Sequence, residues 1–414
     1  MAAIEYEPFD PRFRDDPERH YAMLREQMPV YRSPHGYWVI TKFEDVQSVY
    51  GNPVIYSSAI VGKEAMTQGE SGSAELPSAL TEGSLVNLAE LIATPSIVST
   101  DDPKHTELRR IVNRAFMPKR LAQWDDYIAS AVAECATNIK TGRCWDLVSQ
   151  LAMPLPVSVI SLILGVERER SGDIKRWSDV IITTGQGAER GTPEAQLRML
   201  RMLRDFSDFF IPKINERREN PRDDMISDLV RAEEKETLSN LDTLIFIMAL
   251  MVAGNETTTN LIGNTIVLLL QHPDQLAKVQ AQPELIKNAI EETLRFRSPV
   301  QFSIRAPVVD AELGGQTIRK DEPMVLVIGS ANRDPGKYSN PEQFDVARDT
   351  NRAHFAFGHG IHFCLGFHLA RREATVALGT ILPRLHEWKL AEAPLTRIDS
   401  NLVYGYQSIP LIPR

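Results

Sequence analysis

One cysteine-containing segment constrains this chain more than any other feature. Residues 357–366 read Phe-Gly-His-Gly-Ile-His-Phe-Cys-Leu-Gly, and apolar residues at helical spacing follow from Leu365 until Pro383. The pattern predicts Cys364 at a helix N-terminus, where free backbone N–H groups and the helix dipole favour thiolate over thiol. Side chains are missing around the sulfur at Gly358, Gly360 and Gly366. A flat, bulky ligand could therefore approach the backbone closely.

Two other interpretations of the cysteine segment compete with a ligand site. A buried free cysteine is usually just a small hydrophobic residue, with Phe357 and Phe363 as apolar cover. That interpretation leaves the surrounding glycines unexplained. Zinc is the second alternative, because ligand-type side chains gather within ten residues at His359, His362, Cys364 and His368. Their spacing matches none of the paired-ligand zinc patterns.

A long apolar stretch with a polar centre is the second informative feature. Residues 241–270 read as one helix, with a cap formed by Ser239 and Asp242 and an end at His272-Pro273. The apolar run breaks at residues 254–260, Gly-Asn-Glu-Thr-Thr-Thr-Asn. Buried carboxyl and hydroxyl groups are costly unless they are paired or used. The alternative is a polar turn that faces water.

The cysteine segment resembles the cysteine loop of the cytochrome P-450 family, F-G-x-G-x-H-x-C-x-G, at every fixed position. That family holds haem through a cysteine thiolate. The resemblance implies haem b (iron protoporphyrin IX) as cofactor and Cys364 as the axial iron ligand. His362 would contact a haem propionate, and the loop residues Phe357, Gly358 and Gly366 would also bind the cofactor.

The centre of the long helix also resembles this family, which carries A-G-x-[D/E]-T where dioxygen binds. Residues 253–257, Ala-Gly-Asn-Glu-Thr, fit that pattern. The resemblance implies that Thr257 holds dioxygen and a water molecule, while Glu256 relays protons inward. Relatives that use peroxide lack this pair, so its presence favours reductive activation of O₂.

A pair of charges on a third helix adds structural support. Glu292 and Arg295, at i and i+3, share one face, although such pairs are common on solvated helices. The family has an E-x-x-R helix at this distance before its cysteine, and Arg348 would complete the network. We interpret these three residues as scaffold.

Basic side chains before the long helix suggest an anion partner. His105 and Arg109 lie one helical turn apart, which suits a carboxylate or phosphate, although an ordinary charged helix face gives the same pattern. The resemblance assigns both to the haem propionates, with Arg305 as a third contact. Lys104 and Pro307 depart from the usual family pattern.

Family position also implies which residues line the substrate space: Ala249, Val252, Ala253, Val300, Gln301 and Val403. All but one are small or apolar, so we expect a non-polar small-molecule substrate. The Gly-rich stretches Lys63–Ser84 and Thr183–Pro193 would shape the entrance.

The net charge and the cysteine content of the chain indicate which binding partners and which cellular compartment to expect. The net charge of −9 argues against a nucleic-acid binder. Three cysteines without a CxxC pair suit a reducing cytoplasm. No signal-peptide pattern opens the chain, and the apolar run Leu244–Ala253 is too short to span a bilayer. We expect a cytoplasmic monomer that does not bind membranes.

Electrons must come from separate proteins, because no flavin or nicotinamide fingerprint is present. The resemblance implies NAD(P)H, a ferredoxin reductase and a ferredoxin. Residues 104–120 hold six basic side chains against one acid, a local charge of +5 that suits an acidic donor.

The predicted fold is one domain, residues 1–414, mainly α with a smaller β region (α+β). We expect a hairpin at Val30–Ile40, and strands within Pro299–Val327 with a turn at Gly314-Gly315. Helical spacing is seen at Trp124–Ile139, Trp145–Leu164 and Leu197–Ile214. The predicted activity is insertion of one oxygen atom from O₂ into the substrate. Two rival functions stay open: a haem protein that binds gas or carries electrons, and a non-haem zinc enzyme.

Overall fold

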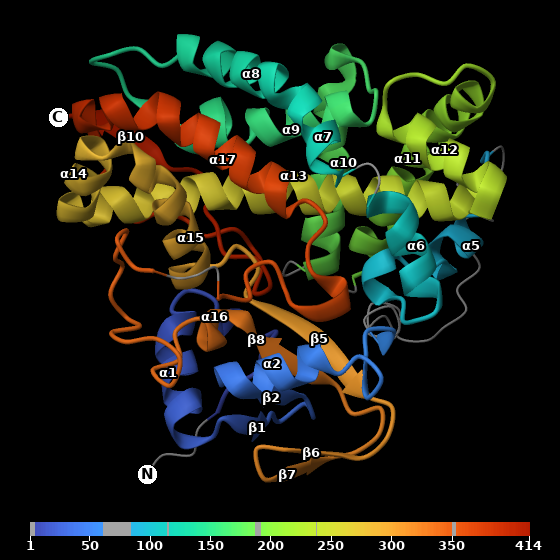
Figure 1. The fold of residues 1–414 in the computed structure, drawn as a ribbon, viewed down its shortest axis with the longest axis horizontal. Helices are drawn as coiled ribbons and strands as arrows, with labels where there is room; N and C mark the ends of the chain where they lie inside the picture. The colour runs from blue at the N-terminus through green and yellow to red at the C-terminus, as the bar shows by residue number, and fades with distance from the viewer. Residues whose placement is uncertain (1–4, 61–83, 114–115, 187–191, 237, 350–352) are drawn as a thin grey trace. The chain divides into compact units, whose positions relative to one another are not determined.

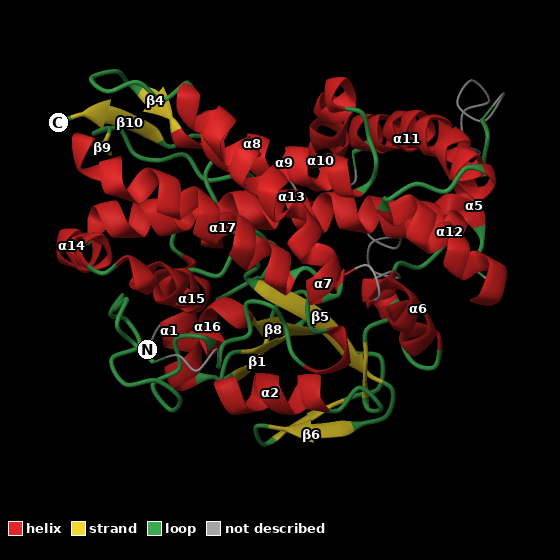
Figure 2. Cartoon of the chain, turned by 45° about the horizontal axis from the view of Figure 1, so that its top comes forward, coloured by secondary structure: helices red, strands yellow, loops and turns green. Residues whose placement is uncertain are grey.

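The computed structural model describes residues 5–60, 84–113, 116–186, 192–236, 238–349 and 353–414 (Figure 1). The chain forms two compact units. The first comprises residues 1–60, 124–156 and 257–414, and the second comprises residues 61–123 and 157–256. Helix α13 (Asn240–Gln271) begins in the second unit and ends in the first. Figure 2 shows that helices dominate and that strands form a smaller part, which confirms the predicted fold class.

A five-stranded sheet in the order β1-β2-β8-β5-β3 organises the N-terminal part of the first unit. Its strands are β1 (Val30–Arg32), β2 (Trp38–Ile40), β3 (Tyr56–Ser57), β5 (Phe302–Pro307) and β8 (Met324–Val327). The predicted hairpin is confirmed, because Val30 pairs with Ile40 in antiparallel register. Strand β2 also pairs with β8, in parallel.

Successive side chains along these strands point to opposite faces of the sheet, so that two apolar layers form. Val39, Val325 and Val327 pack with Tyr21 and Leu24 of α1 (Pro17–Gln27). The intervening residues of the same strands pack on the opposite face, against α2 (Phe43–Gly51). A period of two with both faces buried is typical of a covered sheet.

A second hairpin, β6 (Ala311–Leu313) and β7 (Gln316–Ile318), turns at the predicted Gly314-Gly315. Both glycines have positive φ, +54° and +75°. A two-residue turn of this handedness favours glycine at both positions.

Helices and a small sheet complete the first unit. The helices are α8 (Asp125–Thr137), α14 (Pro273–Ala281), α15 (Ile286–Phe296), α16 (Ile328–Ala331) and α17 (Phe367–Ile381). Helix α17 packs against both α8 and α15. A three-stranded sheet has the order β4-β10-β9, with β4 (Trp145–Asp146), β9 (Trp388–Leu390) and β10 (Pro410–Pro413).

The helical spacing at Trp145–Leu164 predicted a helix that begins too early in the sequence. Residues Trp145–Asp146 form strand β4, which pairs with β10, and α9 begins only at Pro154 (Pro154–Ile163). The Asp146 carboxylate accepts hydrogen bonds from Ser408 Oγ and the Ile409 amide, at 2.5 and 2.7 Å. Contacts with residues more than 250 positions away therefore decide the local structure here.

The second unit is helical: α5 (Leu88–Ala93), α6 (Lys104–Asn113), α7 (Pro118–Leu121), most of α9, α10 (Ser171–Gln186), α11 (Pro193–Glu219) and α12 (Met225–Glu236). Trp177 of α10 is fully buried against Phe206 and Phe210 of α11. Residues 183–186, predicted as loop, continue α10, and the Thr183 and Thr184 hydroxyls bond back to the carbonyls of Asp179 and Val180. The Lys63–Ser84 stretch lies almost wholly outside the described residues.

Helix α13 matches the predicted long helix to within one residue at each end. Its N-terminus carries the predicted cap: Ser239 Oγ accepts from the Asp242 amide at 3.1 Å, and Asp242 accepts from the Ser239 amide at 2.9 Å. By length and composition alone α13 could cross a membrane, but 56% of its most apolar window is buried within the protein.

Candidate functional site

The cysteine segment forms a tight turn before α17. The Cys364 amide donates to the Phe357 carbonyl at 2.8 Å, and the Gly358 amide donates to the Phe355 carbonyl at 2.8 Å. Gly358 and Gly360 have φ of +71° and +70°, a conformation that glycine adopts without strain. Helix α17 begins at residue 367 with Gly366 as its N-cap, so Cys364 lies just before the helix cap and not within the first turn.

Gly360 and Gly366 differ in what surrounds the position that a side chain would occupy. A Cβ atom at Gly360 would lie 2.4 Å from the backbone carbonyl oxygen of Tyr50, at the end of α2. Gly360 is therefore required for packing between the turn and α2. A Cβ atom at Gly366 would meet nothing within 4 Å. None of the described residues therefore occupies the position of this Cβ atom, two residues after the half-buried Cys364.

Aromatic rings cover the cysteine turn. The rings of Phe357, Phe363 and Phe367 have centroids 5.0 to 6.4 Å apart. His362 lies in the 3₁₀ turn Gly360–His362, two residues before Cys364. An open backbone, an apolar surround and one soft sulfur ligand fit a flat metal-containing ring system.

The zinc alternative finds no support in the side-chain positions. Within the described residues, which include the whole 359–368 segment, no three His, Cys, Asp or Glu side chains converge as metal ligands would. A structural zinc ion needs four ligands, and a catalytic zinc ion needs three protein ligands. One cysteine sulfur without converging co-ligands among the described residues fits haem better than zinc.

Part of the middle of α13 is accessible, although much of the helix is buried. Ala249, Val252, Ala253, Glu256 and Thr257 are exposed or half-buried. Their spacing of i, i+3, i+4, i+7 and i+8 places them on a single face. The polar turn of the sequence therefore belongs to the same open face as three small apolar residues.

The opposite side of this turn is tightly packed. Asn255, Thr258 and Thr259 are buried. A Cβ atom at Gly254 would lie 3.5 Å from Ile160 of α9, an ordinary contact distance. Most of the polar stretch is thus not solvated, which disfavours a plain water-facing turn.

Burial gives Glu256 the character of a proton donor. Desolvation raises the pKa of its carboxyl, partly offset by the positive charge of Lys175 and reinforced by Asp179. Lys175 and Asp179 form an ion pair on α10. A carboxyl group with a raised pKa exchanges protons more readily near neutral pH than an ordinary glutamate does.

The structure brings the E-x-x-R residues together in a buried network. Arg295 Nε and Nη2 each donate to Glu292 at 2.8 Å, and both side chains are fully buried. Arg348 Nε donates to the same carboxylate at 3.2 Å. Arg295 also donates to the carbonyls of Asn332 and Pro341, at 3.0 and 2.9 Å. This network fastens α15 to the segment that leads toward the cysteine turn.

The four predicted propionate contacts are divided between the two units, with His362 and Arg305 in the first and His105 and Arg109 in the second. His105 and Arg109 lie on α6 of the second unit, where His105 is buried and Arg109 half-buried. Burial lowers the pKa of His105, partly offset by Asp102, whose Oδ1 lies 3.7 Å from Nδ1. Arg305 lies on β5 of the first unit, with its guanidinium 5.4 Å from the Tyr50 ring centroid. Their convergence on one ligand stays a prediction.

The predicted substrate residues of the first unit divide into two groups. Val300 and Val403 are paired across an isolated antiparallel bridge, which places them side by side. The Gln301 side chain is held by its neighbours: its amide donates to the Ser298 carbonyl at 2.6 Å, and its oxygen packs against Gly329. Its place in the substrate space stays a prediction.

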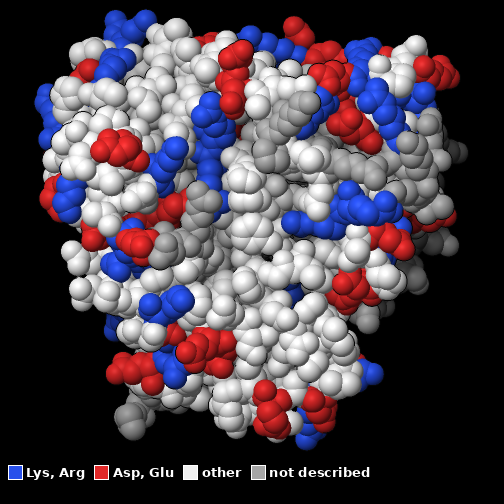
Figure 3. Space-filling view, in the orientation of Figure 1, with Lys and Arg blue, Asp and Glu red and all other residues white. Residues whose placement is uncertain are grey.

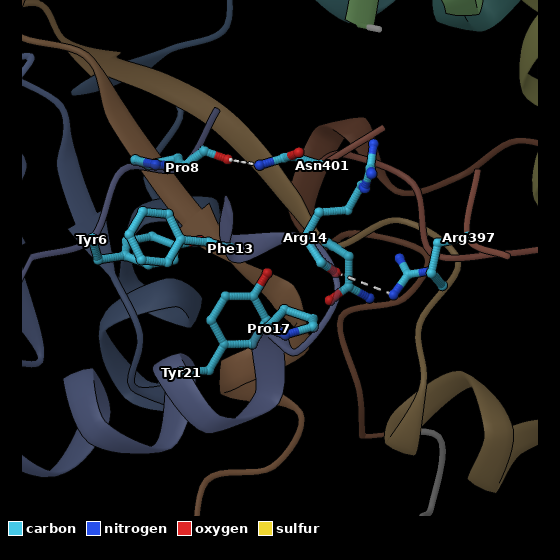
Figure 4. A pocket seen from close by; sticks show the side chains of 9 residues that line it. Tyr6, Pro8, Phe13, Arg14, Pro17, Tyr21, Arg397 and Asn401 are labelled. Atoms are coloured by element: carbon cyan, nitrogen blue, oxygen red, sulfur yellow. Dashed lines mark hydrogen bonds between the residues drawn. The ribbon is translucent and has the colours of Figure 1, made fainter. Parts of the chain in front are cut away.

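Gln301 also lines a small crevice with the N-terminal segment. Figure 4 shows Tyr6, Tyr21 and Arg397 in the wall of this crevice. Asn401 donates to the Pro8 carbonyl at 3.0 Å, and Arg397 donates to the Arg14 carbonyl at 3.3 Å. These bonds fasten the N-terminus to the C-terminal loop.

The basic stretch is less positive than its sequence indicates. Lys104 and Arg110 are exposed on α6. Arg120 forms ion pairs with Asp223 and Asp228. Arg114 and the side chain of Lys119 lie outside the described residues. Figure 3 shows acidic side chains interleaved with basic ones across the visible face of the protein.

Sequence reasoning missed several residues at the cysteine turn. Tyr50 contacts both Gly360 and Arg305, and Glu291, His354 and Arg371 form a polar cluster beside Phe357. On the sequence these are ordinary members of amphipathic helices and loops. No local pattern identifies them, because their partners are distant in sequence.

Comparison with known proteins settles the family. The family model described as Cytochrome P450 matches residues 189–403, just over half of the chain. The putative cytochrome P450 YjiB of Bacillus subtilis is 35% identical over 391 residues, which cover 94% of this chain and 91% of that protein. The chain belongs to the cytochrome P450 family.

Solved P450 structures agree with this assignment. CalO2 superposes with a TM-score of 0.89 at 28% identity, covering 100% of this chain and 99% of that one. CYP109E1 of Bacillus megaterium, solved in complex with testosterone, gives a TM-score of 0.83 at 33% identity, covering 98% of this chain and 100% of that one. This P450 is a monooxygenase, an oxidoreductase that binds haem b.

Proposed function

We propose that this P450 binds haem b through the thiolate of Cys364 and inserts one oxygen atom from O₂ into a non-polar organic molecule. The observation that carries the proposal is the cysteine turn, in which Cys364 precedes α17 and glycines at 358, 360 and 366 leave the backbone around it without side chains. Electrons would come from NAD(P)H through a ferredoxin reductase and a ferredoxin.

The residues of the turn have defined tasks toward the cofactor. Cys364 donates its sulfur, and the N-terminus of α17 favours the thiolate form. His362, together with His105, Arg109 and Arg305, would hold the propionates, while Phe357, Gly358 and Gly366 would contact the ring. When bound, haem supplies a redox-active iron at which dioxygen is reduced.

The open face of α13 supplies protons and orients water. The Thr257 hydroxyl can donate and accept hydrogen bonds, and it follows Glu256 directly on the same face. Because burial raises the pKa of Glu256, its carboxyl can release a proton inward and recover it from outside. A gas-binding or electron-carrying haem protein needs no such pair.

The substrate is proposed to be non-polar. Ala249, Val252 and Ala253 present small apolar side chains on the open face of α13, and Val300 and Val403 add an apolar pair. Apolar walls with few polar groups are typical of pockets for hydrophobic ligands. CYP109E1, with its bound steroid testosterone, is a relative that accepts such a ligand.

The electron donor is proposed to be an acidic ferredoxin that docks on exposed basic residues of α6. Lys104 and Arg110 remain exposed there, although Arg120 is neutralised by its acidic partners. We therefore expect reduction to slow as salt rises, with a modest dependence. A rate of reduction by ferredoxin that is indifferent to ionic strength would remove this surface as the docking site.

We further propose that residues 1–414 act as one haem-thiolate monooxygenase domain, because α13 runs through both compact units without a break. The protein is proposed to work in the cytoplasm as a monomer, without a membrane or nucleic acid. The low cysteine content and the acidic net charge support this.

A carbon monoxide difference spectrum of the reduced protein tests the proposal. We expect the strongly red-shifted Soret band of a thiolate-ligated iron in the wild type and in Cys144→Ser, a control at an exposed cysteine. Cys364→Ser should lose that band. A wild-type spectrum without the red-shifted band would contradict the proposal. Substrate-driven NAD(P)H consumption with oxygenated product then excludes a passive haem protein.

A further inference from the structure

Three polar side chains that belong to no motif lie beside the cysteine turn: Glu291 on α15, His354 before the turn, and Arg371 on α17. We call them the Glu291 cluster. We propose that this cluster is a positioning device that holds the ring of Phe357 and, through the Phe357 backbone, the amide and sulfur of Cys364. The inference rests on the proposed function, because it assumes that Cys364 binds the haem iron.

A largely buried ion pair forms the centre of the cluster. Arg371 Nε donates to Glu291 Oε1 at 2.5 Å and its Nη2 donates to Oε2 at 2.8 Å, with side chains 14% and 12% exposed. Burial alone raises the pKa of Glu291, but hydrogen bonds from Arg371 and His354 lower it to about 2. The carboxylate is therefore charged, and its two-pronged contact fixes the plane of the guanidinium.

His354 ties the start of the turn to the same carboxylate. The Ala356 amide donates to His354 Nδ1 at 3.3 Å, so the ring proton lies on Nε2. Nε2 then donates to Glu291 Oε2 at 3.2 Å, and the side chain of His354 is only 1% exposed. Residues on both sides of Cys364, His354 before it and Arg371 after it, are thus anchored to one residue of α15.

The guanidinium of Arg371 connects the Glu291 cluster to Cys364 through Phe357. Arg371 Cζ lies 4.4 Å from the Phe357 ring centroid and 5.4 Å from that of Phe367, within the range of cation–π attraction. The Phe357 carbonyl accepts the hydrogen bond of the Cys364 amide at 2.8 Å. A displaced Phe357 would therefore displace the residue that presents the sulfur.

A neighbouring ion pair on α17 provides a matched control. Arg372 Nε donates to Asp125 of α8 at 2.7 Å, but these side chains are 49% and 37% exposed. Exposed pairs of this kind contribute little to stability, whereas loss of one partner of a buried pair leaves an uncompensated charge. Arg371→Met and Arg372→Met therefore remove the same side chain, one residue apart, with different expected results.

The first experiment follows thiolate retention in the haem-loaded, full-length protein. The reduced carbon monoxide complex is warmed gently, and the loss of the red-shifted Soret band is timed. Arg371→Met should lose the band at least about tenfold faster than wild type, because the largely buried Glu291 carboxylate loses its charged partner and is left with the hydrogen bond from His354. Arg372→Met should stay within about twofold of wild type. Should Arg371→Met fold poorly, Arg371→Lys keeps the charge without the planar fork and should give an intermediate rate.

A double-mutant cycle tests whether Arg371 acts through Phe357. Phe357→Leu removes the ring, so Arg371→Met added to it should accelerate band loss far less than it does alone. Hydrogen exchange of the Cys364 amide in the haem-free protein gives a second readout. Arg371→Met should speed it without speeding the amide of Ala377, in the middle of α17.

Equal band lifetimes for Arg371→Met and Arg372→Met would overturn the inference, and so would additive effects of the Phe357 and Arg371 variants. If the wild type shows no red-shifted band, the proposed function fails instead. The hydrogen-exchange measurement still tests the role of the Glu291 cluster in that case, because it is made on the haem-free protein.

Discussion

Replacement of Gly360 by alanine tests the packing between the cysteine turn and α2. Gly360 has φ of +70°, and an L-residue in this region costs about 1–2 kcal/mol. The new Cβ atom would also lie 2.4 Å from the Tyr50 carbonyl oxygen, a backbone atom that cannot rotate away. Forced backbone shifts of this kind cost about 1–3 kcal/mol. Gly360→Ala should therefore lower the free energy of unfolding by about 2–5 kcal/mol.

Gly142→Ala separates the two contributions. Gly142 has φ of +74°, and its Cβ atom would meet nothing within 4 Å. Gly142→Ala therefore has the conformational cost of about 1–2 kcal/mol without the steric clash. Urea denaturation of both variants gives the difference. A Gly360→Ala variant no less stable than Gly142→Ala would refute the steric argument for the turn.

Three further predictions concern other parts of the site. Arg295→Met should cost about 3–5 kcal/mol in urea denaturation, because the buried Glu292 carboxylate loses its two-pronged partner and is left with the longer contact to Arg348; a loss below about 1 kcal/mol would mean that the pair is not buried as described. Because the folded pKa of Glu291 is about 2, below its unfolded value, its stabilisation is full above about pH 4.3 and is lost as pH falls toward 2. Glu291→Gln should flatten the acid limb of the stability curve, and an unchanged limb would contradict this. Thr257→Ala should retain haem but divert reducing equivalents to hydrogen peroxide, measured as peroxide per NAD(P)H, whereas the buried Thr258→Ser should not; unchanged coupling in Thr257→Ala would count against its role.

The predictions from sequence succeeded where local patterns carry the structure. The period-two strands around Gly36, the glycine pair at Gly314 and the capped helix α13 each follow from spacing and turn chemistry. The cysteine turn was visible because its glycines have no role in an ordinary helix start. Its geometry adds that Gly360 is required by the Tyr50 backbone.

The remaining features depend on partners far along the chain. Trp145 becomes a strand residue because β10, near the C-terminus, pairs with it. The side-chain oxygen of Gln301 lies beside Gly329 of α16, a contact that the local sequence does not indicate. The Glu291 cluster joins three segments that no spacing rule connects.

The bond between sulfur and iron is the central claim, and X-ray absorption at the iron edge measures it directly. In the ferric wild-type protein we expect one sulfur atom in the first coordination shell, and Cys364→Ser should lose it while Cys144→Ser retains it. A wild-type shell composed only of nitrogen and oxygen would contradict the account.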